Sequence, residues 1–266
     1  MVGPPKNRAH LFDPLLLQHP VFSGLILGQP FMDYGLAQDQ NIVRVNGTTT
    51  PAGAFSWSRN EYGPCGAVGP DEGLVTTLFS DDFDYQSFTF IIWAATTSTG
   101  TGRELFFGTY LSSAEYIRAG RSSNNYYWYI KSGDGIRTTS EATVGHNDGQ
   151  THCFGLSSSP LSMDLYFNGD WQRQIFQGAY PVSHFGSSDT DPIEIGSNDT
   201  ADTWLGTMSL ALLWNRGLSP LEMKLVYDMG PSLTLPSGMD EIYRAAISEG
   251  APAFNAAWAY NSNQVL

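Results

Sequence analysis

The chain has 266 residues and a formal net charge of −13, and it is rich in aromatic residues (13%) and glycine (28 residues) but contains only 15% charged residues. The excess of acidic groups argues against binding to nucleic acid and against docking on anionic membranes, and no apolar run is long enough to insert into a bilayer. An aromatic- and glycine-rich chain of this length is typical of an all-β protein with many tight turns and a substantial core.

The predicted elements are mostly short strands separated by turns. Residues 1–20 are expected to form an extended arm, because prolines lie on both sides of a short leucine run. Phe88–Ala95 is apolar at almost every position, which predicts a central strand that is buried on both faces. Strand candidates lie at Val21–Phe31, Val43–Val45, Gly63–Val68, Leu74–Phe79, Phe88–Ala95, Leu105–Tyr110, Glu115–Ala119, Tyr126–Lys131, Thr139–Val144, Thr151–Ser157, Met163–Phe167 and Pro192–Gly196.

The stretch Trp204–Pro231 predicts a strand followed by a helix. Large apolar residues alternate with smaller residues along the strand, which predicts one buried face formed by Met208, Leu210, Leu212 and Trp214. The helix start carries a capping box with proline at the first helical position, and a glycine–proline pair marks its end. These signals are Ser219, Pro220, Glu222, Gly230 and Pro231.

The same elements define the expected domain organisation. One domain should cover residues 21–232, between the arm of residues 1–20 and a tail of residues 233–266 that holds a second short helix. Cys65 and Cys153 are the two cysteines, and the sequence leaves open whether they form a disulfide or remain two buried thiols.

Several motifs together resemble a known family. They are the strand FTFIIW at residues 88–93, the segments DGQTH at 148–152 and LYFNG at 165–169, and the closing stretch 206–227. The pattern is similar to the laminin G-like domains of the concanavalin A-like jelly-roll superfamily, and the closing motif matches at Asn215, Arg216, Leu218, Ser219 and Glu222. The resemblance implies an all-β, two-sheet antiparallel jelly-roll sandwich with one short helix on its C-terminal side.

The chain also departs from the family pattern. Thr151 stands where the family has tryptophan, and Ser209 and Leu210 stand where it usually has two acidic residues. Members of this family bind glycans, mediate adhesion, decorate viral particles or catalyse reactions, so the fold alone does not give the function.

A calcium site is one hypothesis that the resemblance suggests. Asp33 and Asp39 match the acidic positions of the family's first loop, and Asp202 lies just before the closing strand. Carboxylate oxygens are preferred calcium ligands, but aspartate also forms turns through its side chain, and the sequence favours this second explanation. Apart from this possible calcium ion, the sequence predicts no cofactor.

A glycan-binding face is a second hypothesis. Sugars stack on exposed aromatic rings and hydrogen-bond to planar amides. The candidates are Tyr127 and Tyr129 in the strand YYWY, Asn125 beside them, and Trp171 just after a turn. Ordinary packing of aromatic side chains in a sandwich also explains these residues and is the favoured explanation from the sequence.

Enzymatic activity is not expected, and the sequence predicts no catalytic residues. It contains no nucleophile elbow, zinc-protease motif, phosphate loop or dinucleotide fingerprint. Three fragments resemble those of alginate lyases but occur in the wrong order, and they are Arg103–Leu105, Tyr116–Gly120 and Gln150–His152. Acid–base catalysis needs a convergent set of groups that these fragments do not supply.

The favoured interpretation is a non-enzymatic structural or interaction protein on the surface of a virion, as a capsid decoration or tail component. The absence of a signal peptide or transmembrane segment fits assembly inside a cell, and the arm and tail would contact protein partners in the particle. A free carbohydrate-binding adhesion module, located extracellularly, is the first alternative, and a polysaccharide lyase is the second.

Overall fold

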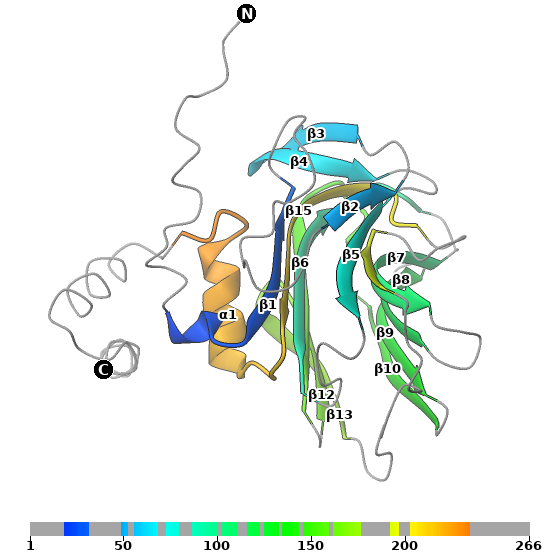
Figure 1. Cartoon of the computed structure of the whole chain (residues 1–266), viewed down its shortest axis with the longest axis vertical. Helices are drawn as coiled ribbons and strands as arrows, with labels where there is room; N and C mark the ends of the chain where they lie inside the picture. Colours follow the sequence, from blue (N-terminus) through cyan, green and yellow to red (C-terminus); the bar gives the residue numbers. More distant parts are fainter. Residues whose placement is uncertain are drawn as a thin grey trace, which may run out of the picture.

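A computed structural model gives the structure of the protein and describes residues 19–31, 49–52, 56–68, 73–79, 87–99, 103–110, 116–122, 125–132, 135–143, 146–159, 162–176, 192–196 and 203–234. These residues form two β-sheets, one α-helix and one short 3-10 helix (Figure 1). The elements are η2 (Pro20–Phe22), β1 (Leu25–Pro30), β2 (Thr49–Ala52), β3 (Ser56–Asn60), β4 (Gly63–Val68), β5 (Gly73–Phe79), β6 (Thr89–Ala95), β7 (Arg103–Tyr110), β8 (Tyr116–Ser122), β9 (Asn125–Ser132), β10 (Gly135–Thr143), β11 (His152–Ser158), β12 (Ser162–Phe167), β13 (Asp170–Phe176), β14 (Pro192–Ile195), β15 (Gly206–Trp214) and α1 (Pro220–Met229).

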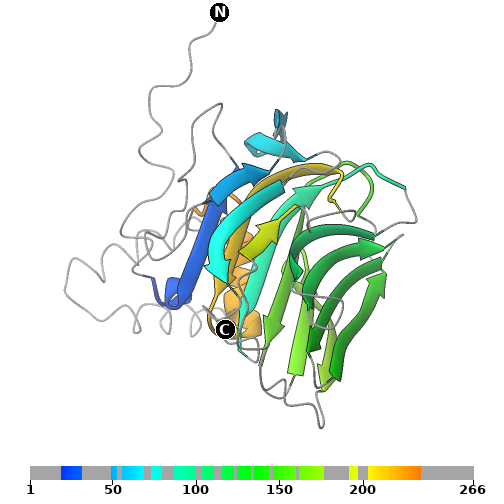
Figure 2. The same cartoon turned by 45° about the vertical axis from the view of Figure 1, so that its right-hand side comes forward.

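Two antiparallel sheets face each other and confirm the predicted jelly-roll sandwich. Sheet A has the order β13-β12-β11-β6-β15-β4-β3, with β1 also paired to β15, and sheet B has the order β10-β9-β8-β7-β14-β5-β2. In both sheets, strands that are distant in sequence are neighbours. In sheet A, for example, β6 lies between β11 and β15 and pairs with both. Figure 2 shows the curved strands of the two sheets.

Apolar side chains fill two layers, one on each side of sheet A. The first layer lies between the sheets and includes Phe90, Phe106, Phe154 and Trp204. The second lies between sheet A and α1, which covers the outer face of this sheet (Figure 1). Because sheet A is covered on both faces, all seven residues of β6 are buried, as predicted for a central strand. Each large apolar side chain buried in this way contributes roughly 1.5–3 kcal/mol.

The strand β15 departs from the predicted alternation. Its register with β6 shifts between Met208 and Leu210, so Ser209 forms a bulge. Met208 therefore faces the layer between the sheets, whereas Leu210, Leu212 and Trp214 face α1. The prediction that Met208, Leu210, Leu212 and Trp214 share one buried face is therefore wrong. The bulge changes the side on which Met208 lies, and both faces of β15 are covered.

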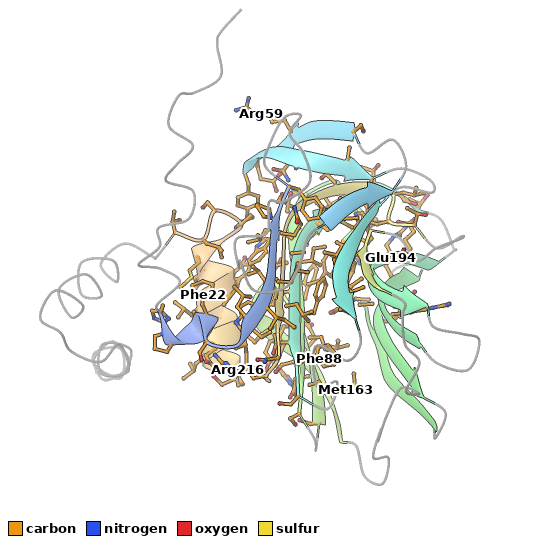
Figure 3. The ribbon with its side chains drawn as sticks, in the orientation of Figure 1. Phe22, Arg59, Phe88, Met163, Glu194 and Arg216 are labelled. Atoms are coloured by element: carbon orange, nitrogen blue, oxygen red, sulfur yellow. The ribbon has the colours of Figure 1, made fainter. Side chains whose placement is uncertain are left out.

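The motif after β15 fastens the first described segment to the sandwich. Arg216 donates from Nε to the carbonyl of Ser23 at 2.7 Å and from Nη2 to Glu222 at 2.7 Å, with further contacts to the carbonyls of Pro20 and Val21 at 3.2 Å. Figure 3 shows Arg216 and Phe22 at this end of α1. The motif residues that match the family therefore hold the N-terminal segment and the helix start together.

Both ends of α1 form as the sequence predicts. Ser219 and Glu222 make a reciprocal capping box, Pro220 occupies the first turn, and Gly230 ends the helix with φ +65°. At the opposite end of the described chain, the observed strand β1 is shorter than the predicted strand Val21–Phe31, because η2 precedes it. His19 caps η2 by accepting a hydrogen bond from the Val21 amide.

The strands β2, β3 and β13 were not predicted from the sequence, and β3 and β13 are edge strands of sheet A. Cys65 and Cys153 are both buried free thiols, so they do not form a disulfide. The candidate strand Val43–Val45, most of the arm and nearly all of the tail lie outside the described residues, and the predicted domain boundaries therefore stay a prediction. In the parts of the chain that the structure describes, no helix has the length and apolar character needed to cross a bilayer.

Candidate functional site

Three turns meet beside the C-terminal half of α1 and form what we call the three-turn surface. They are residues 61–62 between β3 and β4, residues 148–151 before β11, and residues 168–169 between β12 and β13. The strand register brings the second and third turns together, because His152 pairs with Ala94 and Phe154 pairs with Phe167 at the same end of sheet A. In Figure 1 this is the end at which α1 finishes.

Hydrogen bonds connect the first turn to the second. The Glu61 carboxylate accepts from the Thr151 amide at 2.8 Å, and the Asn60 amide group donates to the Thr151 hydroxyl at 2.9 Å. Asn60 also donates to the hydroxyl of Ser209, the bulged residue of β15, at 2.7 Å. The bulge therefore places a hydroxyl group that anchors the turn of residues 61–62 to the centre of the sheet.

His152 connects the second turn to the third. Its Nε2 lies 3.0 Å from the Asp148 carboxylate, and its Nδ1 lies 3.1 Å from the Asn168 side-chain nitrogen, which fits a neutral ring that donates from Nε2. Asn168 has φ +51° and also accepts from the Cys153 amide at 2.9 Å. Because both ring nitrogens have partners in these turns, His152 links the second turn to the third.

Aromatic rings line the surface that these turns support. The side chains of Tyr62 and Trp171 are 47% and 55% exposed, and Tyr227 of α1 is half-buried. Trp171 donates from Nε1 to the Asp164 carboxylate at 3.0 Å, which fixes the orientation of its ring. Tyr227 packs directly over Gly169, where an added Cβ would lie 2.7 Å from the tyrosine ring.

Charged groups surround these rings. Lys224 lies 4.8 Å from the centre of the Tyr227 ring and donates to Asp228 at 2.7 Å, and its pKa is raised mainly by this hydrogen bond. Burial alone would raise the pKa of Glu61, but hydrogen bonds from its own backbone and from Thr151 outweigh burial and lower it. The pKa of Asp148 is lowered for the same kind of reason, by hydrogen bonds from Gln150 and His152 that outweigh burial. At neutral pH these acids are carboxylates that accept hydrogen bonds.

The arrangement is suited to binding a sugar chain. Exposed aromatic rings give flat apolar faces for the C–H face of a sugar, and carboxylates accept hydrogen bonds from hydroxyl groups. The hydrogen bonds between the turns keep these groups in place before a ligand arrives, which reduces the entropy lost on binding.

The structure separates the predicted glycan-binding residues. Trp171 belongs to the three-turn surface, whereas Asn125, Tyr127 and Tyr129 lie on β9 in sheet B. Tyr127 is only 1% exposed, which corrects the expectation of an accessible ring, because a buried ring offers no face to a sugar. Asn125 is half-buried, and the side chain of Tyr129 lies outside the described residues.

The other predicted groups do not gather into a site within the described residues. Asp33, Asp39 and Asp202, the proposed calcium ligands, all lie outside them. No three histidine, cysteine, aspartate or glutamate side chains come close enough to hold a metal ion in the regions that are described. Glu104, from one of the lyase-like fragments, is 4% exposed and forms an ion pair with Arg121 inside the sandwich, so it is not positioned to meet a substrate.

Sequence reasoning missed Tyr62, Glu61 and Tyr227. Each stands in a short turn or on a helix that looks ordinary in the sequence, and they lie far from Trp171 along the chain. The one local signal was the asparagine–glycine turn at residues 168–169, which marked where a ring such as Trp171 would be exposed.

The comparisons with known proteins agree with this architecture. Two antiparallel sheets with α1 on the outer face of one of them define a concanavalin A-like sandwich. The sequence model of the concanavalin A-like lectin/glucanases superfamily (Laminin_G_3) matches residues 71–224, more than half of the chain. The chain therefore belongs to this family, as the motifs predicted. No curated protein matches the sequence.

Solved structures share the fold at low sequence identity. Domain 4 of AbnA, an extracellular arabinanase of family GH43 from Geobacillus stearothermophilus in complex with arabinotriose, is 12% identical, with a TM-score of 0.61 over 75% of this chain and 96% of that one. The binding domain of Paraclostridial Mosquitocidal Protein 1 is 12% identical, with a TM-score of 0.60 over 78% of this chain and 52% of that one.

A chain of botulinum neurotoxin type C, whose cell entry depends on interaction with two ganglioside molecules, is 12% identical, with a TM-score of 0.61 over 78% of this chain and 51% of that one. This chain therefore matches about half the length of the two toxin chains. At these identities the likeness shows the fold alone.

Proposed function

We propose that this protein is a non-catalytic carbohydrate-binding module and that the three-turn surface holds the sugar. The observation that carries the proposal is Trp171, a 55% exposed ring whose indole nitrogen is held by Asp164 on a rigid hairpin. An exposed indole ring offers a flat apolar face, and the hydrogen bond to Asp164 holds that face in an orientation that suits stacking against a sugar.

Membership of a lectin and glucanase superfamily supports a role in carbohydrate recognition, and two neighbours in fold are named for arabinotriose or ganglioside interactions. The non-catalytic part of the proposal rests on the candidate acid and base groups. The Nδ1 lone pair of His152 already accepts from Asn168, and Glu104 is buried in an ion pair, which supports structural roles for both residues.

A glycan array followed by calorimetric titration of the best ligand tests this function. Trp171→Ala should weaken binding by about tenfold or more, because it removes the stacking face. Leu221→Ala is the matched control, since Leu221 is 66% exposed at the other end of α1. If Trp171→Ala and the unaltered chain bind with equal affinity, the ligand lies elsewhere on the protein. If no glycan on the array binds, the proposal is rejected.

The residues predicted on sheet B define the alternative location for the same function. Asn125→Ala and Tyr129→Ala would weaken binding if the sugar lies on β9, and would leave it unchanged if it lies on the three-turn surface. The calcium site at Asp33, Asp39 and Asp202 stays a separate proposal that a calorimetric titration with calcium after chelation would test.

A place on the surface of a virion is the second function that we propose, and it rests on the sequence alone. The proline-rich arm of residues 1–20 and the tail of residues 233–266 are the segments expected to contact protein partners. Such a component would co-purify with particles at a fixed ratio, and deletion of residues 1–18 would release it. A chain that never associates with particles but binds sugar would leave only the free binding module.

A further inference from the structure

We infer that the three-turn surface selects uncharged glycans and disfavours glycans that carry carboxylate or sulfate groups. This inference rests on the proposed carbohydrate-binding function and adds the chemical class of the ligand. It comes from the charges that the fold gathers around the exposed rings of Tyr62 and Trp171, which no single stretch of the sequence contains.

Carboxylates are contributed by the first and second turns, by the strands β12 and β13 that the third turn joins, and by α1, where one lies beside Tyr227. They are Glu61, Asp148, Asp164, Asp170 and Asp228. Most of these groups are exposed, so a sugar that stacks on Trp171 meets a surface with a negative potential.

Among the side chains that the structure describes here, the cations do not reverse this potential. Lys224 is already paired with Asp228 at 2.7 Å, and it also interacts with Asp170. His152 is held by Asp148, and the hydrogen bond from Asn168 to its Nδ1 fits the neutral ring. Arg59 is exposed on the edge strand β3 and points away from the sheets in Figure 3.

The chemistry of each ligand class decides which one fits. Hydroxyl groups of a neutral sugar donate to carboxylates, so the acids add hydrogen bonds to the stacking contact. A carboxylate or sulfate on the sugar cannot donate and is repelled. In water, each like charge at about 8 Å weakens binding by about two- to threefold at low salt.

The test uses pairs of glycans that differ in charge. Lactose is compared with 3′-sialyllactose, and xylotetraose with its glucuronic-acid-substituted form, on an array and then by calorimetry at low salt. The neutral member of each bound pair should bind at least about fourfold more tightly, which is the effect of two like charges. Raising the salt to about 1 M, where the screening length falls to about 3 Å, should remove most of the difference.

Variants connect the selectivity to this surface. The double variant Asp170→Asn with Asp228→Asn should narrow the gap between neutral and anionic glycans by about fourfold. Glu194→Gln is the matched control, because it removes one carboxylate from sheet B, on the far side of the sandwich from α1 (Figure 3). It should leave the gap unchanged.

The outcomes separate the two proposals. If no glycan binds, the carbohydrate-binding function fails and this inference fails with it. If glycans bind in a Trp171-dependent way but the anionic members bind as tightly as the neutral ones at low salt, the function stands and the selectivity is wrong. An equal effect of the double variant and of Glu194→Gln would likewise overturn the role of these carboxylates.

Discussion

The buried ion pair between Glu104 and Arg121 gives the strongest stability prediction. Glu104 is 4% exposed and Arg121 is 0% exposed, and the two side chains lie opposite each other on β7 and β8. Arg121 donates from Nε to Glu104 at 2.9 Å and from Nη2 at 2.5 Å, and the Ser98 hydroxyl donates to the same carboxylate at 2.6 Å. The pair therefore joins sheet B to the segment that follows β6 of sheet A.

Removing one partner should cost far more than removing both. Arg121→Met leaves a carboxylate in the interior without its cation, which costs about 3–5 kcal/mol of unfolding free energy. Glu104→Leu leaves the guanidinium without its partner and should cost a similar amount. The double variant replaces the pair with apolar groups of similar volume, and such replacements are often neutral or even stabilising.

Urea denaturation of the four proteins, followed by tryptophan fluorescence, measures this coupling directly. The double variant should be more stable than either single variant, with an interaction energy of about 3 kcal/mol or more. A cost below about 1 kcal/mol for Arg121→Met would show that the charges are solvated. A double variant as unstable as the sum of the singles would show that the site depends on shape and not on charge.

Three further predictions concern the rest of the scaffold. Burial lowers the pKa of His19 despite the opposing charge of Glu222. The free energy of unfolding should therefore fall as the pH drops from 6.5 toward the pKa of His19 in the folded protein. His19→Asn should flatten this pH dependence in urea titrations across that range. Ser219→Ala should lower stability by about 1 kcal/mol in the same assay, because it removes the capping box of α1. Gly206→Ala should destabilise severely, since its Cβ would lie within 2 Å of a backbone oxygen, whereas Gly155→Ala should cost less because only the end of a methionine must move.

Each of these predictions has an outcome that contradicts it. A pH dependence that survives His19→Asn would assign the effect to another group, because the folded protein would still bind fewer protons than the unfolded chain. No loss of stability in Ser219→Ala would mean that Glu222 alone satisfies the helix start. A tolerated Gly206→Ala would mean that β6 and β15 can separate there without loss of their hydrogen bonds.

The helix-capping half of the Asn-Arg-x-Leu-Ser-x-x-Glu motif could be predicted before the fold was known, because capping is local, whereas the contacts of Arg216 with Pro20, Val21 and Ser23 could not. Ser219, Glu222 and Gly230 cap one helix through contacts within a few residues, and the order of the motifs identified the sandwich. The central position of β6 could also be predicted from the sequence, since a strand that is apolar on both faces has to be covered on both faces.

Which side chains of β15 lie on which face of sheet A, and where the edge strands lie, depend on pairing with other strands. The local hydrophobic pattern does not encode this pairing. The bulge at Ser209 puts Met208 on the opposite face of β15 from Leu210, and the Ser209 hydroxyl accepts a hydrogen bond from Asn60, which is distant in the sequence. The strand β13 was missed because an edge strand carries polar residues, which read as a loop.

The sequence by itself determined the family, the central strand, the capped helix and one exposed ring, Trp171, because propensity, capping and hydrophobic pattern act over short distances. Only the tertiary structure decided that Tyr127 is buried and that Tyr62 and Tyr227 lie on the same surface as Trp171. The physical reason is long-range pairing: β11 and β12 are neighbours in sheet A, and hydrogen bonds from Asn60 and to Glu61 join the end of β3 to Thr151, across distances along the chain that no local pattern can span.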